Sequence, residues 1–139
     1  KNIRVSLFIE PSEEQVNAAK SIGADIIELH TGQYCELFEE NDEGHIELIK
    51  VLEKAARYAH TLGLEVHAGH GLTYKSAKIL SKVKGISEFN IGHFLVGESI
   101  FVGLEKSIKK FCSMCKKDIG YASREESNNF LRPRGYQNT

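Results

Sequence analysis

One histidine lies between two glycines, directly after a short apolar run, and this segment is the part of the sequence most suited to proton transfer. The histidine is His70, flanked by Gly69 and Gly71. Imidazole changes charge near neutral pH, and glycine allows the sharp turns and close ligand approach that a side chain blocks. Thr73 is suited to cap a helix over 74–83, whose N-terminus would attract an anion. The segment therefore predicts an anion site with a proton donor; the structural alternative is a loop imidazole bonded to a carbonyl.

Glu28 is the second candidate, within a strand predicted over 25–30. Alternation puts Glu28 and His30 on one face and the apolar Ile27 and Leu29 on the other. A carboxylate on an inner face is costly unless it is paired or hydrogen-bonded. Glu28 is therefore predicted either to act in catalysis or to form an ion pair inside the fold.

Gly92 and His93 stand at the end of a strand predicted over 88–92 and complete the candidate set. In parallel barrels the last two loops often bind phosphate through backbone N–H groups and the N-terminus of a short extra helix. The segment 94–97 can supply that helix, and Gly71 belongs to the preceding loop. We therefore predict that Gly71, Gly92 and His93 bind phosphate, the alternative being that they are ordinary turn residues.

These candidates lie at the ends of predicted strands that alternate with predicted helices. Strands are expected where polar and apolar residues alternate, and helices where apolar residues recur every three or four positions. The expected strands are 4–9, 25–30, 64–69 and 88–92. The expected helices run from Ser12 to Gly23 and over 45–62, 74–83 and 98–117, and the polar segment 33–44 is expected to be a loop.

The alternation predicts an α/β fold with right-handed βαβ units and a parallel sheet. Strands of a doubly wound sheet are apolar on both sides, but these are apolar on one side and carry residues such as Glu28, His67 and Asn90 on the other. A (β/α)8 barrel fits this pattern, and it needs about 250 residues and eight units. We expect residues 1–117 to supply four units, half of a TIM-type barrel, and residues 118–139 to be a poorly ordered or partner-dependent tail.

The composition suits one soluble globular domain, because the chain has 139 residues of which 41% are hydrophobic and 27% charged. A net charge of -1 offers no basic field for nucleic acid or an anionic membrane, and no apolar run suggests a membrane span or a signal peptide. Lys1 is not preceded by Met, so we expect the chain to begin within a longer protein. Three cysteines are too few for a disulfide framework, which favours the cytoplasm, and Cys112 and Cys115 lack the second ligand pair of a zinc site, so no metal is expected.

Four segments occur in the order and close to the spacing of the carboxyl-terminal half of the pyridoxine 5'-phosphate synthase family. They are Val5–Ile9, Ile27–Gly32, Ala68–Leu72 and Asn90–His93. The resemblance covers about residues 3 to 117 and implies a (β/α)8 barrel that is cytoplasmic and homo-oligomeric. It further implies condensation of 3-amino-2-oxopropyl phosphate with 1-deoxy-D-xylulose 5-phosphate to give pyridoxine 5'-phosphate, phosphate and water.

Carried over by motif, the resemblance makes His70 the proton donor and Glu28 a carboxylate that stabilises the transition state. Gly71, Gly92 and His93 would hold the amino-ketone phosphate, and no cofactor is implied. Family members usually carry a basic residue where this chain has Glu98, and a negative charge there weakens phosphate binding unless it points away.

Two other functions are compatible with the sequence. One is a phosphate-binding or self-assembling half-barrel without catalysis, in which exposed edge strands pair two copies. The other is a small doubly wound nucleotide-binding protein, which would have a glycine-rich loop after its first strand. The segment 10–12, Glu-Pro-Ser, is not such a loop.

Overall fold

The computed structural model describes residues 3–115, which contain four strands and six helices. The strands are β1 (Ser6–Ile9), β2 (Ile26–His30), β3 (Glu65–Gly69) and β4 (Glu88–Asn90). The helices are α1 (Glu13–Ser21), α2 (Gly32–Glu39), α3 (Gly44–Thr61), α4 (Tyr74–Leu80), α5 (His93–Val102) and α6 (Leu104–Cys115). The expected tail 118–139 lies outside the described residues.

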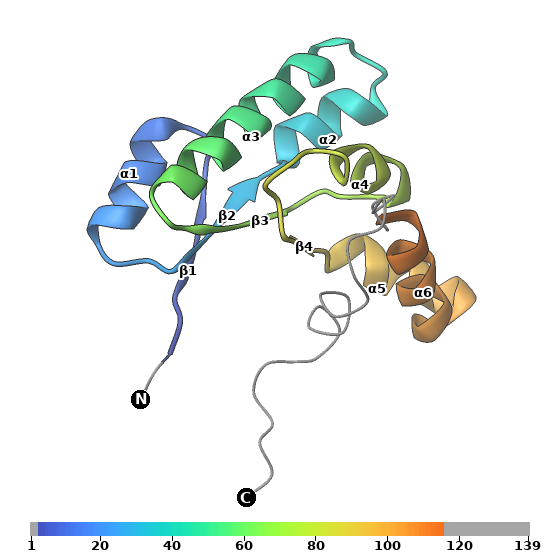
Figure 1. Ribbon diagram of the computed structural model, residues 1–139. Coiled ribbons are helices and arrows are strands. Elements are labelled where there is room, and N and C mark those ends of the chain that lie inside the picture. The colour runs from blue at the N-terminus through green and yellow to red at the C-terminus, as the bar shows by residue number, and fades with distance from the viewer. Residues whose placement is uncertain (1–2, 116–139) are drawn as a thin grey trace, which may run out of the picture.

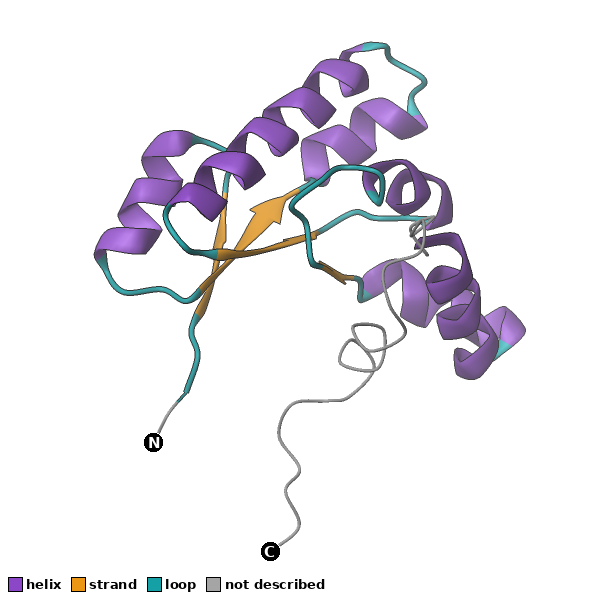
Figure 2. Cartoon of the chain, in the orientation of Figure 1, coloured by secondary structure: helices purple, strands orange, loops and turns teal. Residues whose placement is uncertain are grey.

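The strands form one parallel sheet in the order β1-β2-β3-β4, so each strand pairs with the next one along the chain. Helices α1 and α3 lie across one face of this sheet (Figures 1 and 2). Ile27, Leu29, Val66 and Ala68 are fully buried in the core. Phe8, which alternation places on the other face, is 56% exposed. The alternation of strands and helices confirms the predicted α/β fold, consistent with half of a barrel whose inner face is open.

The long helix α3 packs closely on the sheet because its inner side is built from small residues. Ala55, Ala56 and Ala59 are buried on α3 together with Leu52. Alanine brings the helix backbone near the strands and has the highest helix propensity of the common residues. The helix begins at Gly44 and ends at Thr61, within one residue of the predicted bounds at each end.

The prediction of a loop over 33–44 is wrong, because residues 32–39 form helix α2. This segment is rich in acidic residues, but one side of the helix is buried and carries Tyr34 and Cys35. The Tyr34 hydroxyl donates a hydrogen bond of 3.0 Å to the backbone oxygen of Ser76, which ties α2 to α4. The helix is thus held by tertiary contacts that a count of polar residues does not show.

The predicted helix over 98–117 is also wrong, because the structure has two helices, α5 and α6, on either side of Gly103. Gly103 has φ of +87°, which lies outside the helical region and is readily adopted only by glycine. Helix α5 begins at His93, so the short helix expected over 94–97 is its first part. Helix α4 follows the predicted Thr73 cap, whose hydroxyl accepts from the Ser76 backbone N–H, but it ends at Leu80.

Candidate active site

A hollow of about 650 Å³ lies at the carboxyl ends of the strands. The structure brings all five of the predicted site residues to its wall, from β2, from the loop after β3 and from the junction of β4 with α5. They are Glu28, His70, Gly71, Gly92 and His93. Phe8, Thr73, Asn90 and Phe94 line the same hollow. The common location follows from the parallel sheet, since parallel strands end at the same edge.

Glu28 projects from β2 toward β4 across the inner face of β3. One of its carboxylate oxygens accepts a hydrogen bond of 2.6 Å from the Asn90 side-chain amide. Gly69 of β3 lies between these two residues and leaves the space that their contact needs. A Cβ atom at position 69 would collide with the Glu28 carboxylate and lie 2.8 Å from the backbone oxygen of Asn90. Among residues 3–115, Glu28 is thus held by the neutral Asn90 amide and not by a cationic side chain.

The backbone of His70 is held in a conformation that is unusual for a residue with a side chain. Its φ is +80°, in the left-handed region. The buried Thr31 hydroxyl lies 2.7 Å from the Gly69 carbonyl oxygen and 2.6 Å from the His70 carbonyl oxygen, and donates its proton to this pair. The Cys35 thiol adds a longer contact of 3.7 Å to the His70 oxygen. These contacts from the loop and helix after β2 hold the strained turn, which leaves the imidazole exposed in the hollow.

The two glycines of the predicted phosphate site are required for different reasons. Gly71 has φ of +79°, and a Cβ atom there would lie 3.0 Å from the Cys35 Cβ, so the fold itself requires glycine. Gly92 has φ of -111°, and a Cβ atom there would have no neighbour within 4 Å. The fold therefore leaves Gly92 free to change, so a need for glycine at this position would have to come from a ligand.

The N-terminus of α5 completes the hollow. Gly92 precedes the helix and has no side chain to cap it, while His93 and Phe94 of the first turn line the wall. Free N–H groups at the start of a helix of 10 residues carry a partial positive charge that suits a phosphate. Backbone N–H groups are thus the anion-binding groups that this end of the sheet offers.

Glu98, whose charge was expected to weaken phosphate binding, is not among the residues that line the hollow. Its carboxylate lies 3.8 Å from the Lys110 ammonium of α6, and the side chain is 26% exposed. The same ammonium lies 3.9 Å from the centre of the Tyr74 ring. Lys110 thus offsets the negative charge of Glu98, which reduces the expected repulsion of a phosphate at α5.

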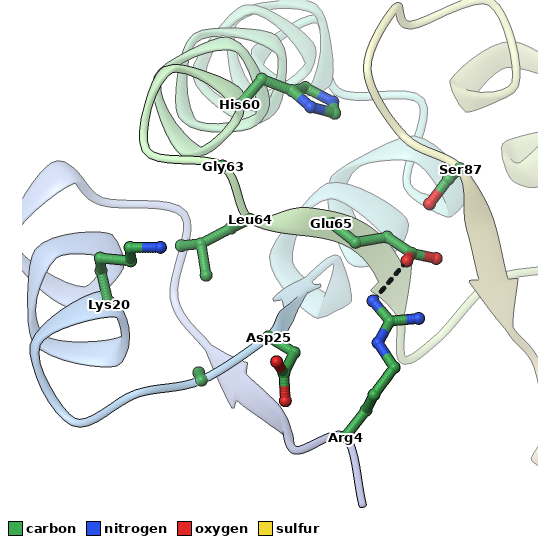
Figure 3. A pocket seen from close by; sticks show the side chains of 9 residues that line it. Arg4, Lys20, Asp25, His60, Gly63, Leu64, Glu65 and Ser87 are labelled. Carbon is green, nitrogen blue, oxygen red and sulfur yellow. Dashed lines mark hydrogen bonds and ion pairs between the residues drawn. The ribbon is translucent and has the colours of Figure 1, made fainter. Parts of the chain in front are cut away.

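A second hollow, of about 510 Å³, lies at the amino ends of the same strands (Figure 3). Arg4 donates a hydrogen bond of 2.6 Å to Glu65 across it. This bond and a further one from His67 hold the pKa of Glu65 below its usual value. Asp25 accepts from the Val5 backbone N–H at 2.9 Å. Arg4 and Glu65 are thus paired with each other, and Asp25 is bonded to the backbone.

Sequence reasoning missed three residues that shape the site. Asn90 was recognised only as an inward-facing residue, and Thr31 and Cys35 were not recognised as contacts of His70. Burial raises the pKa of the Cys35 thiol, which keeps it protonated and able to donate. Within residues 3–115 no cluster of three or more potential metal-binding side chains is found, and no helix has the length and hydrophobicity to cross a bilayer.

Comparison with known proteins adds an independent finding. Residues 1–117 match the family described as pyridoxal phosphate biosynthesis protein PdxJ. The chain is 56% identical over 108 residues to a protein of Zymomonas mobilis subsp. mobilis named pyridoxine 5'-phosphate synthase, a match that covers 78% of this chain and 41% of the relative. A protein of the same name from Pelagibacter ubique is 48% identical over 117 residues, covering 84% of this chain and 48% of the relative. The chain therefore spans less than half the length of these curated relatives.

Proposed function

This chain belongs to the PdxJ family of pyridoxal phosphate biosynthesis proteins, and we propose that it forms the carboxyl-terminal half of a pyridoxine 5'-phosphate synthase. The proposed reaction condenses 3-amino-2-oxopropyl phosphate with 1-deoxy-D-xylulose 5-phosphate and releases pyridoxine 5'-phosphate, phosphate and water. The observation that carries the proposal is the convergence of Glu28, His70 and the α5 N-terminus on one hollow.

The phosphate of the amino-ketone would be bound by backbone N–H groups of Gly71, Gly92 and His93. Holding that phosphate fixes the reacting carbons relative to His70, which removes much of the entropic cost of the reaction. The helix N-terminus supplies partial positive charge without a metal ion or a basic side chain.

His70 is proposed as the general acid. Dehydration and phosphate loss each require that a departing oxygen receives a proton, and a positioned acid typically accelerates such a step by about 10²- to 10⁴-fold. Glu28, held by Asn90, would stabilise positive charge that develops on the substrate nitrogen. No redox cofactor is needed, because the condensation and eliminations balance without an external electron acceptor.

The remainder of the barrel is proposed to lie in the part of the relatives that this chain does not match. The free edges of β1 and β4 would pair with its strands, as closure of a barrel requires. Ile100 and Phe101 on α5 are 79% and 86% exposed, which supports the proposal of a homo-oligomer with α5 at a contact between subunits. Free thiols at Cys35, Cys112 and Cys115 agree with the proposed cytoplasmic location.

The decisive experiment measures pyridoxine 5'-phosphate formation by the intact gene product, which is the whole protein that contains this chain. We expect turnover that requires both phosphorylated substrates and that is lost in His70→Ala. Product formation without the amino-ketone, or a normal rate in His70→Ala, contradicts the proposal. A native mass measurement on the 139-residue chain tests the alternative of a self-assembling half-barrel, which predicts a dimer.

A further inference from the structure

Next to His70 lies an imidazole that the proposed reaction does not use. The ring centres of His30 and His70 are 4.7 Å apart, with the planes inclined by 58°. His30 is only 26% exposed on its side chain, and its Nδ1 lies 2.9 Å from a carboxylate oxygen of Glu10. Glu10, His30 and His70 therefore form a continuous row along the rim of the sheet, from the end of β1 to the loop after β3.

The His30 ring packs against Phe8 and lies close to Gly32. Phe8 packs edge-on against it, with ring centres 5.0 Å apart, and also lies 6.2 Å from the His70 ring centre. Gly32 lies beneath both imidazoles, because a Cβ atom there would be 2.8 Å from His30 Nε2 and 3.1 Å from His70 Cδ2. The absence of a side chain at Gly32 is thus what allows the two rings to meet.

The Glu10 contact also fixes which nitrogen of His30 carries a proton. An ionised carboxylate only accepts hydrogen bonds, so His30 Nδ1 must be the donor. Nε2 is then the variable nitrogen, and it lies on the Gly32 side of the ring, where His70 is also found.

We propose that Glu10 and His30 form a carboxylate–imidazole pair that positions the His70 ring for proton transfer. The inference rests on the proposed function, since it gives His70 the role of acid. His30 is a positioning residue in this scheme, because it acts through His70. The Glu10 contact holds the His30 ring, and packing against His30 fixes the direction of the His70 ring.

The other groups around this pair are unchanged in the test variants. Glu28 and His93 share the hollow with His70, and the Cys35 thiol contacts its carbonyl oxygen. Glu10→Gln removes one negative charge and keeps a hydrogen-bond acceptor for His30 Nδ1. The hold on the His30 ring should therefore be weakened but not lost in Glu10→Gln, whereas His30→Phe removes the bond altogether.

The test compares Glu10→Gln and His30→Phe in the intact gene product, with steady-state kinetics. In Glu10→Gln kcat should fall by no more than about threefold, because an acceptor for His30 Nδ1 remains. In His30→Phe the aromatic packing is kept but the pair is broken, and kcat should fall about 10- to 100-fold, as expected for a misplaced catalytic group. KM should change less than about twofold in both, because substrate binding is not altered.

The control is His60→Gln. His60 bonds to the Gly85 carbonyl oxygen at 2.7 Å beside the other hollow, and kcat and KM should both match the wild type. A purely structural role for the pair would raise KM in His30→Phe as much as it lowers kcat, and that result overturns the inference. Wild-type kinetics in both variants, with activity still lost in His70→Ala, overturn it too while leaving the proposed function intact. Absence of product from the wild type contradicts the proposed function itself.

Discussion

Hollows of similar volume lie at the two ends of the same sheet, but their charged residues have different partners. At the amino ends Arg4 is bonded to Glu65, and Asp25 is bonded to the backbone N–H of Val5, directly before β1. At the carboxyl ends Glu28 is held by a neutral amide, and the His70 side chain is exposed. Arg4 and Glu65 neutralise each other, whereas no cationic side chain is bonded to Glu28 among the described residues. The hollow at the carboxyl ends is therefore the better candidate for a reactive site.

The same substitution at both ends gives the largest contrast. Glu28→Gln keeps the size and the Asn90 contact but removes the charge, and kcat of the intact gene product should fall about 10²- to 10³-fold, as for loss of one electrostatic stabiliser. Glu65→Gln should leave kcat unchanged. Equal losses in the two variants would show that carboxylates at both ends matter and would remove the distinction.

Two glycines at the carboxyl end should respond in different ways. Gly69→Ala places a methyl group against Glu28 and Asn90, and we expect a loss of about 1–3 kcal/mol in the free energy of unfolding, typical of overpacking. Gly92→Ala should change stability by less than about 0.5 kcal/mol, since the position is open. Denaturant titration measures both values.

Gly92→Ala also tests the proposed phosphate site. If backbone N–H groups approach a phosphate there, the added methyl group should raise KM for the amino-ketone phosphate while the fold is unchanged. An unaltered KM would remove Gly92 from the binding site and leave Gly71 and His93 as the remaining candidates.

Thr31→Val examines the support of the reactive turn. The substitution keeps the shape but removes the hydroxyl that serves the Gly69 and His70 carbonyl oxygens, so we expect a loss of about 1–3 kcal/mol in stability. Thr61→Val is the control, because the Thr61 hydroxyl bonds only within its own helix, to Tyr58, at an exposed position. A neutral effect in Thr31→Val would show that the turn holds its conformation without this hydroxyl.

The amino end should show a small, pH-dependent contribution to stability. The hydrogen bond from Arg4 is the main cause of the lowered pKa of Glu65, so the ionised form is favoured by folding. This stabilisation is present above the ordinary carboxyl pKa and is lost as pH falls through the lower folded value. Glu65→Gln should cost less than about 1 kcal/mol at pH 7, because the pair is exposed. The difference from wild type should vanish in thermal melts at acid pH.

Local patterns were enough to predict which end of the sheet carries the candidate residues. Alternation along β2 placed Glu28 opposite Ile27 and Leu29, and the glycine turns marked the strand ends at His70 and Gly92. These signals arise within a few residues, which is the range over which a strand repeats. The catalytic and binding roles of these residues stay predictions.

The contacts that hold the site could not be predicted in this way. Asn90 meets Glu28 across 62 positions of the chain, and Thr31 meets His70 across 39. Such pairs depend on strand register and on the loop after β2, neither of which leaves a local pattern. The end of α5 was missed for a different reason, since a single glycine at 103 interrupts an otherwise continuous apolar periodicity.

The sequential order of the strands bears on how the protein is made. Each strand pairs with the one synthesised just before it, so a growing polypeptide can assemble β1 with β2 while β4 is still inside the ribosome. Pairing of neighbours in sequence makes each closing loop shorter than pairing of more distant strands would, which lowers its entropic cost. Translation can therefore build the His70 turn on a sheet that already exists, with Thr31 in place before the strained backbone emerges.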